Sequence, residues 1–303
     1  MSIAAQAASI SAPFSSDYTL VSLAGPAVTA PYGGIAFLND NTLLIGGAAN
    51  NGSGVIDEVP VTRDVNGNIN GFGSVTQFST APNIDGGLAF GPGGDLFYTA
   101  YPINTLGEIK PGSTSPDDLI PLTSVGVGTS VGTLAFVPAG FNGAGNFVLG
   151  SYNQGTFCTA SLTPDGTGTY NVGTCTANAG NTTGGGPEGI IYIPQGSADF
   201  AGQTALVSLY SAGIVDSYSI DANGLPIAST ATPFITGLTG AEGALIDPVT
   251  GDFLFSTFGG GNQIVEVRGF AVPPSSAPEP AAIFLMTAGL VSIAGLHRRA
   301  ARS

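Results

Sequence analysis

Short apolar runs recur along this chain at similar intervals, and each is followed by a turn rich in Gly, Asn or Asp. Their second residues lie at positions 35, 88, 134, 190 and 244, so successive runs begin 46 to 56 residues apart. None of them has a sustained 3.6-residue apolar period, which predicts strands rather than helices as the repeating unit. The five runs are Gly34–Leu38, Gly87–Phe90, Thr133–Val137, Gly189–Ile193 and Gly243–Ile246.

Each apolar run begins a similar series of four predicted strands. The run itself is continuously apolar, as expected of a strand buried on both faces. A second strand follows after a turn, then a strand of alternating polarity, and last a strand typical of a sheet edge. Repeats of about 40–50 residues with four strands each are typical of propeller blades. The sequence therefore predicts an all-β, five-bladed β-propeller over residues 13–271, with six blades as the alternative.

The fifth repeat ends after its third strand, near Phe270, and so lacks an outer strand. The segment Tyr18–Leu23 is apolar enough to supply one. It ends 12 positions before Ile35, the same spacing that separates Leu122 from Leu134 in a later repeat. We therefore expect this N-terminal strand to close the ring, which would also cover the exposed edge of the last sheet.

The apolar runs and the strands after them also carry a family resemblance. Gly87–Phe90 followed by Gly94–Tyr98 resembles the repeats of NHL and gluconolactonase-like propellers, and similar positions extend over most of residues 30–268. The resemblance implies a propeller. Many gluconolactonase-like members hydrolyse lactones or phosphoesters with a divalent cation at one mouth of the channel, whereas many NHL members only bind ligands.

Charge and composition exclude several functions. Only 9 % of the residues are charged, and the 19 acidic and three basic residues before position 278 give this part a net charge of −16. A body so acidic repels phosphates, which excludes nucleic-acid binding. The only histidine is His297 and the only lysine Lys110, so the predicted propeller has no Ser-His-Asp triad, Cys-His pair or His-containing zinc site. This favours, without deciding it, a role other than catalysis.

Carboxylates precede glycines at the start of three predicted inner strands, at Asp85, Glu188 and Glu242. In a propeller these connections open on one face, so the three side chains are expected to converge at one mouth of the channel. Oxygen ligands of this kind suit Ca²⁺ or Mg²⁺, although each carboxylate could instead cap backbone N–H groups of a loop. Loops between second and third strands supply the candidate ligand-binding residues Tyr101, Asn104, Tyr152, Asn153, Tyr210 and Asn262.

The two cysteines flank a cluster of turn residues, Pro164–Gly168. A four-residue loop at positions 165–168 would place Cys158 opposite Cys175 in a hairpin. The sequence predicts a disulfide between them, with two free buried cysteines as the alternative. Disulfides persist mainly in oxidising compartments, so the predicted bridge agrees with export.

The C-terminal region has three parts in series. Residues 281–296 form a sixteen-residue segment without a charge, about 24 Å long as a helix, which predicts a single transmembrane helix. The following arginines favour a cytoplasmic C-terminus, and the alternative is an apolar tail packed on the propeller. The flanking residues are Pro278, Glu279 and Pro280 before the segment and Arg298, Arg299 and Arg302 after it.

This order of parts resembles the PEP-CTERM sorting domain. The resemblance implies export in a Gram-negative, exopolysaccharide-producing bacterium, and an exosortase as the partner that processes the tail near Glu279. It also implies a protein tethered to the inner membrane through residues 281–296 and later placed on the outer surface or in the extracellular matrix.

The N-terminal residues 1–12 contain Ala5-Gln6-Ala7, the pattern of a signal-peptidase cleavage site, but no basic region and no apolar core. We interpret them as the remnant of a signal peptide whose start lies upstream, or as a disordered start. The predicted order is then residues 1–12, the propeller over 13–271, a Pro- and Ser-rich linker over 272–280, and the membrane segment with its basic tail over 281–303.

These parts together predict an exported propeller that acts as a binding or interaction module. Extracellular polysaccharide and other surface proteins are its expected partners. The alternative is a divalent-metal-dependent, lactonase-like hydrolase that uses the carboxylates at the channel mouth.

Overall fold

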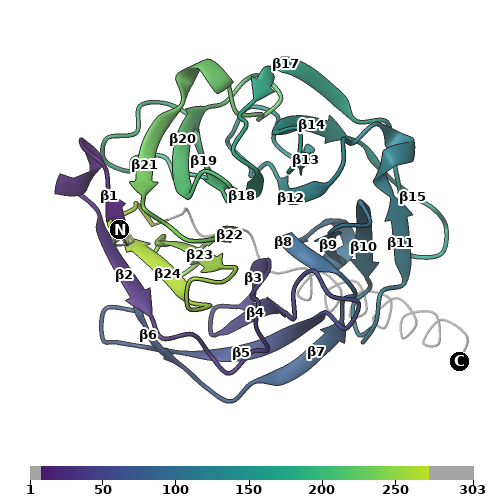
Figure 1. The fold of residues 1–303 in the computed structure, drawn as a ribbon, viewed down its shortest axis with the longest axis horizontal. Helices are drawn as coiled ribbons and strands as arrows, with labels where there is room; N and C mark the ends of the chain where they lie inside the picture. The colour runs from purple at the N-terminus through teal and green to yellow at the C-terminus, as the bar shows by residue number, and fades with distance from the viewer. Residues whose placement is uncertain (1–7, 273–303) are drawn as a thin grey trace, which may run out of the picture.

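The computed structural model describes residues 8–272, which form a ring of five antiparallel blades around a central channel (Figure 1). This confirms the predicted all-β, five-bladed propeller. The predicted transmembrane helix, the sorting residues, most of the linker and residues 1–7 lie outside the described residues. Among the described residues, no helix combines the length and apolar character needed to cross a membrane.

Each blade consists of an inner, a second, a third and an outer strand. The inner strands are β3 (Ile35–Asn39), β8 (Ile84–Phe90), β12 (Val131–Phe136), β18 (Pro187–Tyr192) and β22 (Ala241–Ile246). The second strands are β4 (Thr42–Gly47), β9 (Leu96–Ala100), β13 (Phe147–Ser151), β19 (Thr204–Leu209) and β23 (Phe253–Thr257). The third strands are β5 (Val55–Arg63), β10 (Thr105–Ile109), β14 (Thr156–Ala160), β20 (Ile214–Ser219) and β24 (Ile264–Arg268). The outer strands are β7 (Thr76–Thr80), β11 (Asp118–Pro121), β17 (Thr176–Thr182), β21 (Thr232–Thr236) and β2 (Thr19–Leu23).

Short strands and 3₁₀ turns are added to these four-stranded blades. Strand β6 (Ile69–Phe72) pairs with the far end of β5, and β15 (Leu162–Pro164) pairs with β16 (Tyr170–Val172) as a separate hairpin. Four 3₁₀ turns are described in the loops and near the N-terminus: η1 (Phe14–Ser16), η2 (Pro92–Gly94), η3 (Leu122–Val125) and η4 (Ala228–Thr230).

The N-terminal strand closes the ring as predicted. Strand β2 pairs antiparallel with β24, from Thr19 opposite Arg268 to Leu23 opposite Ile264. Strand β1 (Ser9–Ile10), which precedes the predicted start of the propeller at residue 13, pairs with β21 and adds a fifth strand to the fourth blade. The N-terminal segment therefore bridges the last two blades, where it covers two sheet edges at once.

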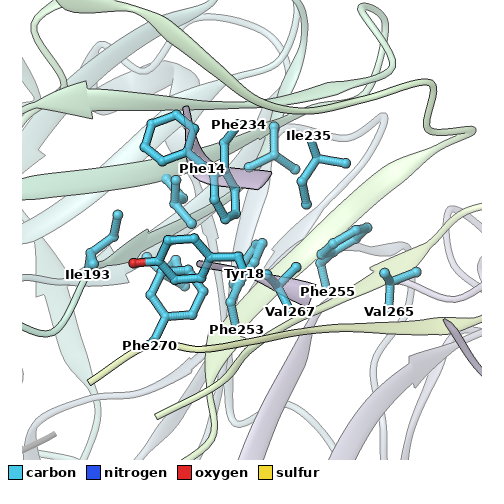
Figure 2. Close-up of a cluster of buried hydrophobic side chains, with 13 residues drawn as sticks. Phe14, Tyr18, Ile193, Phe234, Ile235, Phe253, Phe255, Val265, Val267 and Phe270 are labelled. Carbon is cyan, nitrogen blue, oxygen red and sulfur yellow. The ribbon is translucent and has the colours of Figure 1, made fainter. Parts of the chain in front are cut away.

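A cluster of aromatic side chains holds this N-terminal segment in place (Figure 2). Phe14 and Tyr18 pack against Phe234 of blade four, with ring centroids 5.2 and 5.5 Å away, and Tyr18 also lies 4.6 Å from Phe270. The Tyr18 hydroxyl donates a 2.6 Å hydrogen bond to the Ala198 carbonyl. Closure is thus stabilised by buried aromatic area as well as by strand pairing.

Two arginines also join the fifth blade to the first, across the seam between these two blades. Arg63 donates to both oxygens of the buried Asp247 carboxylate, at 2.7 and 3.0 Å. Arg268 pairs with Glu266 and donates to the carbonyl of Ile69 on β6. Bidentate pairs between Arg and a carboxylate are directional, so they fix the orientation of the β5–β6 hairpin across the seam.

The cysteine hairpin has a different register from the predicted one. Pro164 pairs with Tyr170, which leaves a five-residue loop at 165–169 in place of the expected four. The Asp165 carboxylate stabilises this longer loop by accepting hydrogen bonds from the backbone N–H groups at positions 167 and 169. In the separate pairing of β14 with β17, Cys158 lies opposite Ala177, although a disulfide still joins it to Cys175 across a Cα–Cα distance of 5.6 Å.

We predict that Phe14→Ala destabilises the whole propeller. Removing a buried aromatic side chain costs about 3–5 kcal/mol, and here the loss falls on the segment that closes the ring. Urea unfolding should show a lower midpoint, and the freed edges should promote aggregation. Val65→Ala is the control because the Val65 side chain is 99 % exposed. Equal midpoints for the two variants would show that closure does not depend on this cluster.

Candidate functional site

The three predicted carboxylates lie in β-bulges at the beginning of their inner strands. The pairing register shifts between Ile84 and Leu88, and again at Glu188 and at Glu242–Gly243. A bulge locally bends a strand and redirects its side chains. The bulges thus interrupt the alternation of side chains between the two faces of the sheet at the three carboxylate residues.

Glycines allow the inner strands to approach one another closely at the end of the channel where the three carboxylates lie. A Cβ atom on Gly243 would lie 2.6 Å from the Gly34 Cα, and one on Gly34 would lie 2.7 Å from the Leu88 Cβ. Both distances are closer than real Cβ contacts. The Gly34 N–H donates a 2.7 Å hydrogen bond to the Asp85 carbonyl of the next blade. We call this arrangement of Gly34, Gly86, Gly132, Gly189 and Gly243 the glycine collar.

The carboxylates of Asp85, Glu188 and Glu242 converge at the collar. Each contributes an oxygen, and these oxygens lie within 4.8 Å of one another, while the residues are only 1, 4 and 1 % exposed. No basic side chain compensates them among residues 8–272. The basic residues in this range each pair with a carboxylate outside the cluster; they are Arg63, Lys110 and Arg268.

Burial raises the pKa of all three carboxyl groups well above the usual range. The neighbouring charges of Asp85 and Glu242 raise the pKa of Glu188 further. Both carboxylate oxygens of Glu242, and one each of Asp85 and Glu188, have no hydrogen-bond partner among the described residues. The Gly86 backbone N–H donates to Asp85 and Glu188, so capping satisfies these two carboxylates in part. The oxygens that remain unpartnered, above all both of Glu242, favour a site that accepts protons or a cation.

A cavity of about 220 Å³ opens over the three carboxylates. Its wall is largely aromatic, with Tyr101 and Tyr152 6.1 Å apart, Tyr152 and Tyr210 6.1 Å apart, and Tyr210 and Phe258 5.9 Å apart between ring centroids. Asn50 of the first blade completes the lining, with its buried side-chain oxygen unpartnered.

The aromatic wall comes from one position that recurs in the repeats. Tyr101, Tyr152, Tyr210 and Phe258 each follow directly after the second strand of their blade, and the first blade has Ala48 there. An alignment of the chain on the ends of its second strands could therefore have revealed Phe258, which a search for polar residues missed. Asn50 belongs to the loop between the second and third strands of the first blade, the same kind of loop that carries the predicted ligand-binding residues.

Three of the predicted ligand-binding residues do not line the cavity. The Asn104 side chain is buried in its own loop, where it accepts from the Val131 N–H and donates to the Val127 carbonyl. The Asn262 side chain accepts from the Gly259 N–H within a turn, and Asn153 is exposed away from the lining. Asparagine amides in tight loops satisfy the nearby backbone, which explains why position alone did not predict a role.

Comparisons with known proteins give a likeness in fold only. No family model matches the sequence, and no curated protein matches it. Among solved structures, an auxiliary nutrient binding protein from Bacteroides ovatus is 10 % identical, with a TM-score of 0.44 and coverage of 83 % of this chain and 76 % of that one. A streptogramin B lyase is 11 % identical, with a TM-score of 0.41 and coverage of 83 % and 97 %. The fold itself rests on the strand order described above.

We predict that the cation-free protein becomes less stable as the pH rises from about 5 to 8. A carboxyl group whose pKa is raised on folding favours the folded state when protonated, and this contribution is lost as the pH rises towards the raised value. Thermal unfolding in the presence of a chelator should show the falling midpoint. The double variant Glu188→Gln/Glu242→Gln should reduce this dependence, while the part that comes from other buried carboxyl groups, such as Asp252 and Glu266, should remain.

Glu108 provides the control for this pH dependence. It is buried far from the collar, on β10, and burial raises its pKa to about 8. Glu108→Gln should therefore change only the part of the pH dependence that comes from Glu108 and its neighbour Asp95. If the double variant and Glu108→Gln leave identical pH profiles, the three collar carboxylates do not titrate as a cluster.

Proposed function

We propose that the carboxylate mouth, the end of the channel at which Asp85, Glu188 and Glu242 line the cavity, binds a divalent cation, Ca²⁺ or Mg²⁺. We propose also that the propeller acts as an exported binding module. The observation that carries this proposal is three buried carboxylates within 4.8 Å of one another, with no basic side chain beside them among the described residues. A cation removes their mutual repulsion and occupies the unpartnered oxygens. Calcium takes six to eight oxygen ligands, so the Asn50 amide oxygen, phenols and water would complete its shell.

The shape of the cavity supports binding rather than turnover. About 220 Å³ is enough for a cation and a small ligand or one part of a larger one, and the aromatic wall offers flat apolar faces. The lining offers no histidine, cysteine or lysine. Extracellular polysaccharide or another surface protein would present oxygen groups to the outward face of the cation.

A lactonase-like hydrolase is the second candidate. The three neighbouring carboxylates favour it, because a carboxylate that is not itself a ligand of the cation could take a proton from a water bound to the cation. Assays of sugar lactones and phosphoesters with the cation-loaded protein separate the two functions. Turnover that disappears in Glu188→Gln/Glu242→Gln would establish the hydrolase, whereas tight cation binding without turnover supports the binding module.

We predict cation-dependent stabilisation of the chelator-treated protein. Calcium or magnesium at 100 times its Kd should stabilise the fold by about 2.7 kcal/mol. The double variant Glu188→Gln/Glu242→Gln should not respond, while Glu108→Gln, a buried carboxyl change outside the site, should respond like the parent. Thermal unfolding and titration calorimetry measure both. A parent without any cation-dependent shift, or a double variant with the full shift, contradicts the metal site.

We further propose that the tail is a sorting signal cut by an exosortase near Glu279, after tethering at the inner membrane through residues 281–296. The order of Pro278-Glu279-Pro280, apolar segment and arginines supports this, and a disulfide agrees with an oxidising compartment. The processed protein would then reach the outer surface or the extracellular matrix.

For this tail, we predict that Glu279→Ala, or replacement of Arg298 and Arg299 by Ala, leaves unprocessed protein in the membrane fraction of the native host. Mass spectrometry of the C-terminus measures the processing. Ser275→Ala, in the preceding linker, should be processed normally. Normal processing of both tail variants would contradict the sorting signal.

A further inference from the structure

The inner strands end at a second mouth, at the opposite end of the channel from the carboxylates. They begin at the glycine collar, and their last residues include Phe90, Phe136, Tyr192 and Ile246. These four residues line a cavity of about 950 Å³, more than four times the volume of the one over the carboxylates. Figure 1 shows the inner strands gathered around the centre of the ring.

The lining of the second mouth is apolar and uncharged. It comes mainly from aliphatic and aromatic residues of β8, β12, β18 and β22 and of the loop around Phe141, and it contains no Asp, Glu, Lys or Arg. Gln195, at its rim, already donates to the Gly140 carbonyl. Apolar concavities of this size rarely stay open to water unless something binds in them.

The chain leaves the propeller at this same mouth. Val272, the last described residue, lines the cavity and is 62 % exposed. Eight residues, 273–280, separate it from the uncharged segment at 281–296. Extended at about 3.3 Å per residue, they span up to about 26 Å, which is enough to return the segment to the mouth. Such a short connection gives a high effective concentration of the segment at the cavity.

We propose that the second mouth holds part of residues 281–296 of the same chain whenever no membrane is available to them. As a helix, the segment would be about 24 Å long and about 10 Å wide, so the cavity accommodates one face of it. Burial of its apolar side chains against the lining replaces their contact with water. A lipid bilayer buries more of the same segment, so membrane insertion competes with the mouth and empties it. This proposal does not depend on the cation at the other mouth.

Cysteine crosslinking in the full chain tests the occupant directly, because the two native cysteines are joined in a disulfide and leave no free thiol. Ser292→Cys places a thiol in the apolar segment. A second one is introduced at Ala139 or Gln195, exposed residues that line the second mouth. The matched control is Asn153→Cys, which is exposed near the carboxylate end.

We expect the Ala139 and Gln195 pairs to form an intramolecular disulfide at least about tenfold faster than the Asn153 pair under mild oxidation. Mass spectrometry of non-reduced peptides identifies the link. Vesicles of phosphatidylethanolamine and phosphatidylglycerol should reduce its yield severalfold.

Three results would overturn the proposal or a part of it. Equal rates for the mouth and control pairs would show that the segment does not reside in the cavity. Links that form between chains, and that disappear on dilution, would assign the mouth to a second copy instead. A yield unchanged by vesicles would overturn the competition with the membrane.

Discussion

The close approach of five inner strands at the glycine collar determines most of what this protein can do. At Gly34 and Gly243 there is no space for a Cβ atom, and backbone groups of neighbouring blades contact each other directly. Side chains that begin an inner strand must therefore leave the collar towards the mouth. The bulges at Glu188 and Glu242 direct them there, which brings carboxylates from three blades together.

This concentration of negative charge is unfavourable by itself, and the rest of the molecule does not relieve it. Arg63 and Arg268 lie at the seam between the first and fifth blades, where they pair with Asp247 and Glu266. The stability that tolerates the carboxylates comes from apolar clusters between blades and from the closing N-terminal segment. The carboxylates must then either hold protons or bind a cation, and the pH and the cation concentration decide between these states.

The repeat made the fold predictable, while the site depended on details finer than the repeat. Continuous apolar runs located the five inner strands, and the missing outer strand at Phe270 pointed to closure by Tyr18–Leu23, because both follow from burial and edge pairing. The pairing of β1 with the fourth blade and the five-residue loop at Asp165 rest on local hydrogen bonds that apolar patterns do not encode. Likewise, an asparagine's position in a loop does not reveal whether its amide turns inward, as at Asn104.

The two ends of the channel have opposite chemistry because the inner strands all run in the same direction. Their first residues supply glycines and carboxylates, and their last residues supply aromatic and aliphatic side chains around the point where Val272 leaves the ring. The described chain therefore ends at the apolar mouth, at the opposite end of the channel from the carboxylates. If the carboxylate mouth binds a partner as proposed, that partner would approach from the end of the channel at which the described chain does not end.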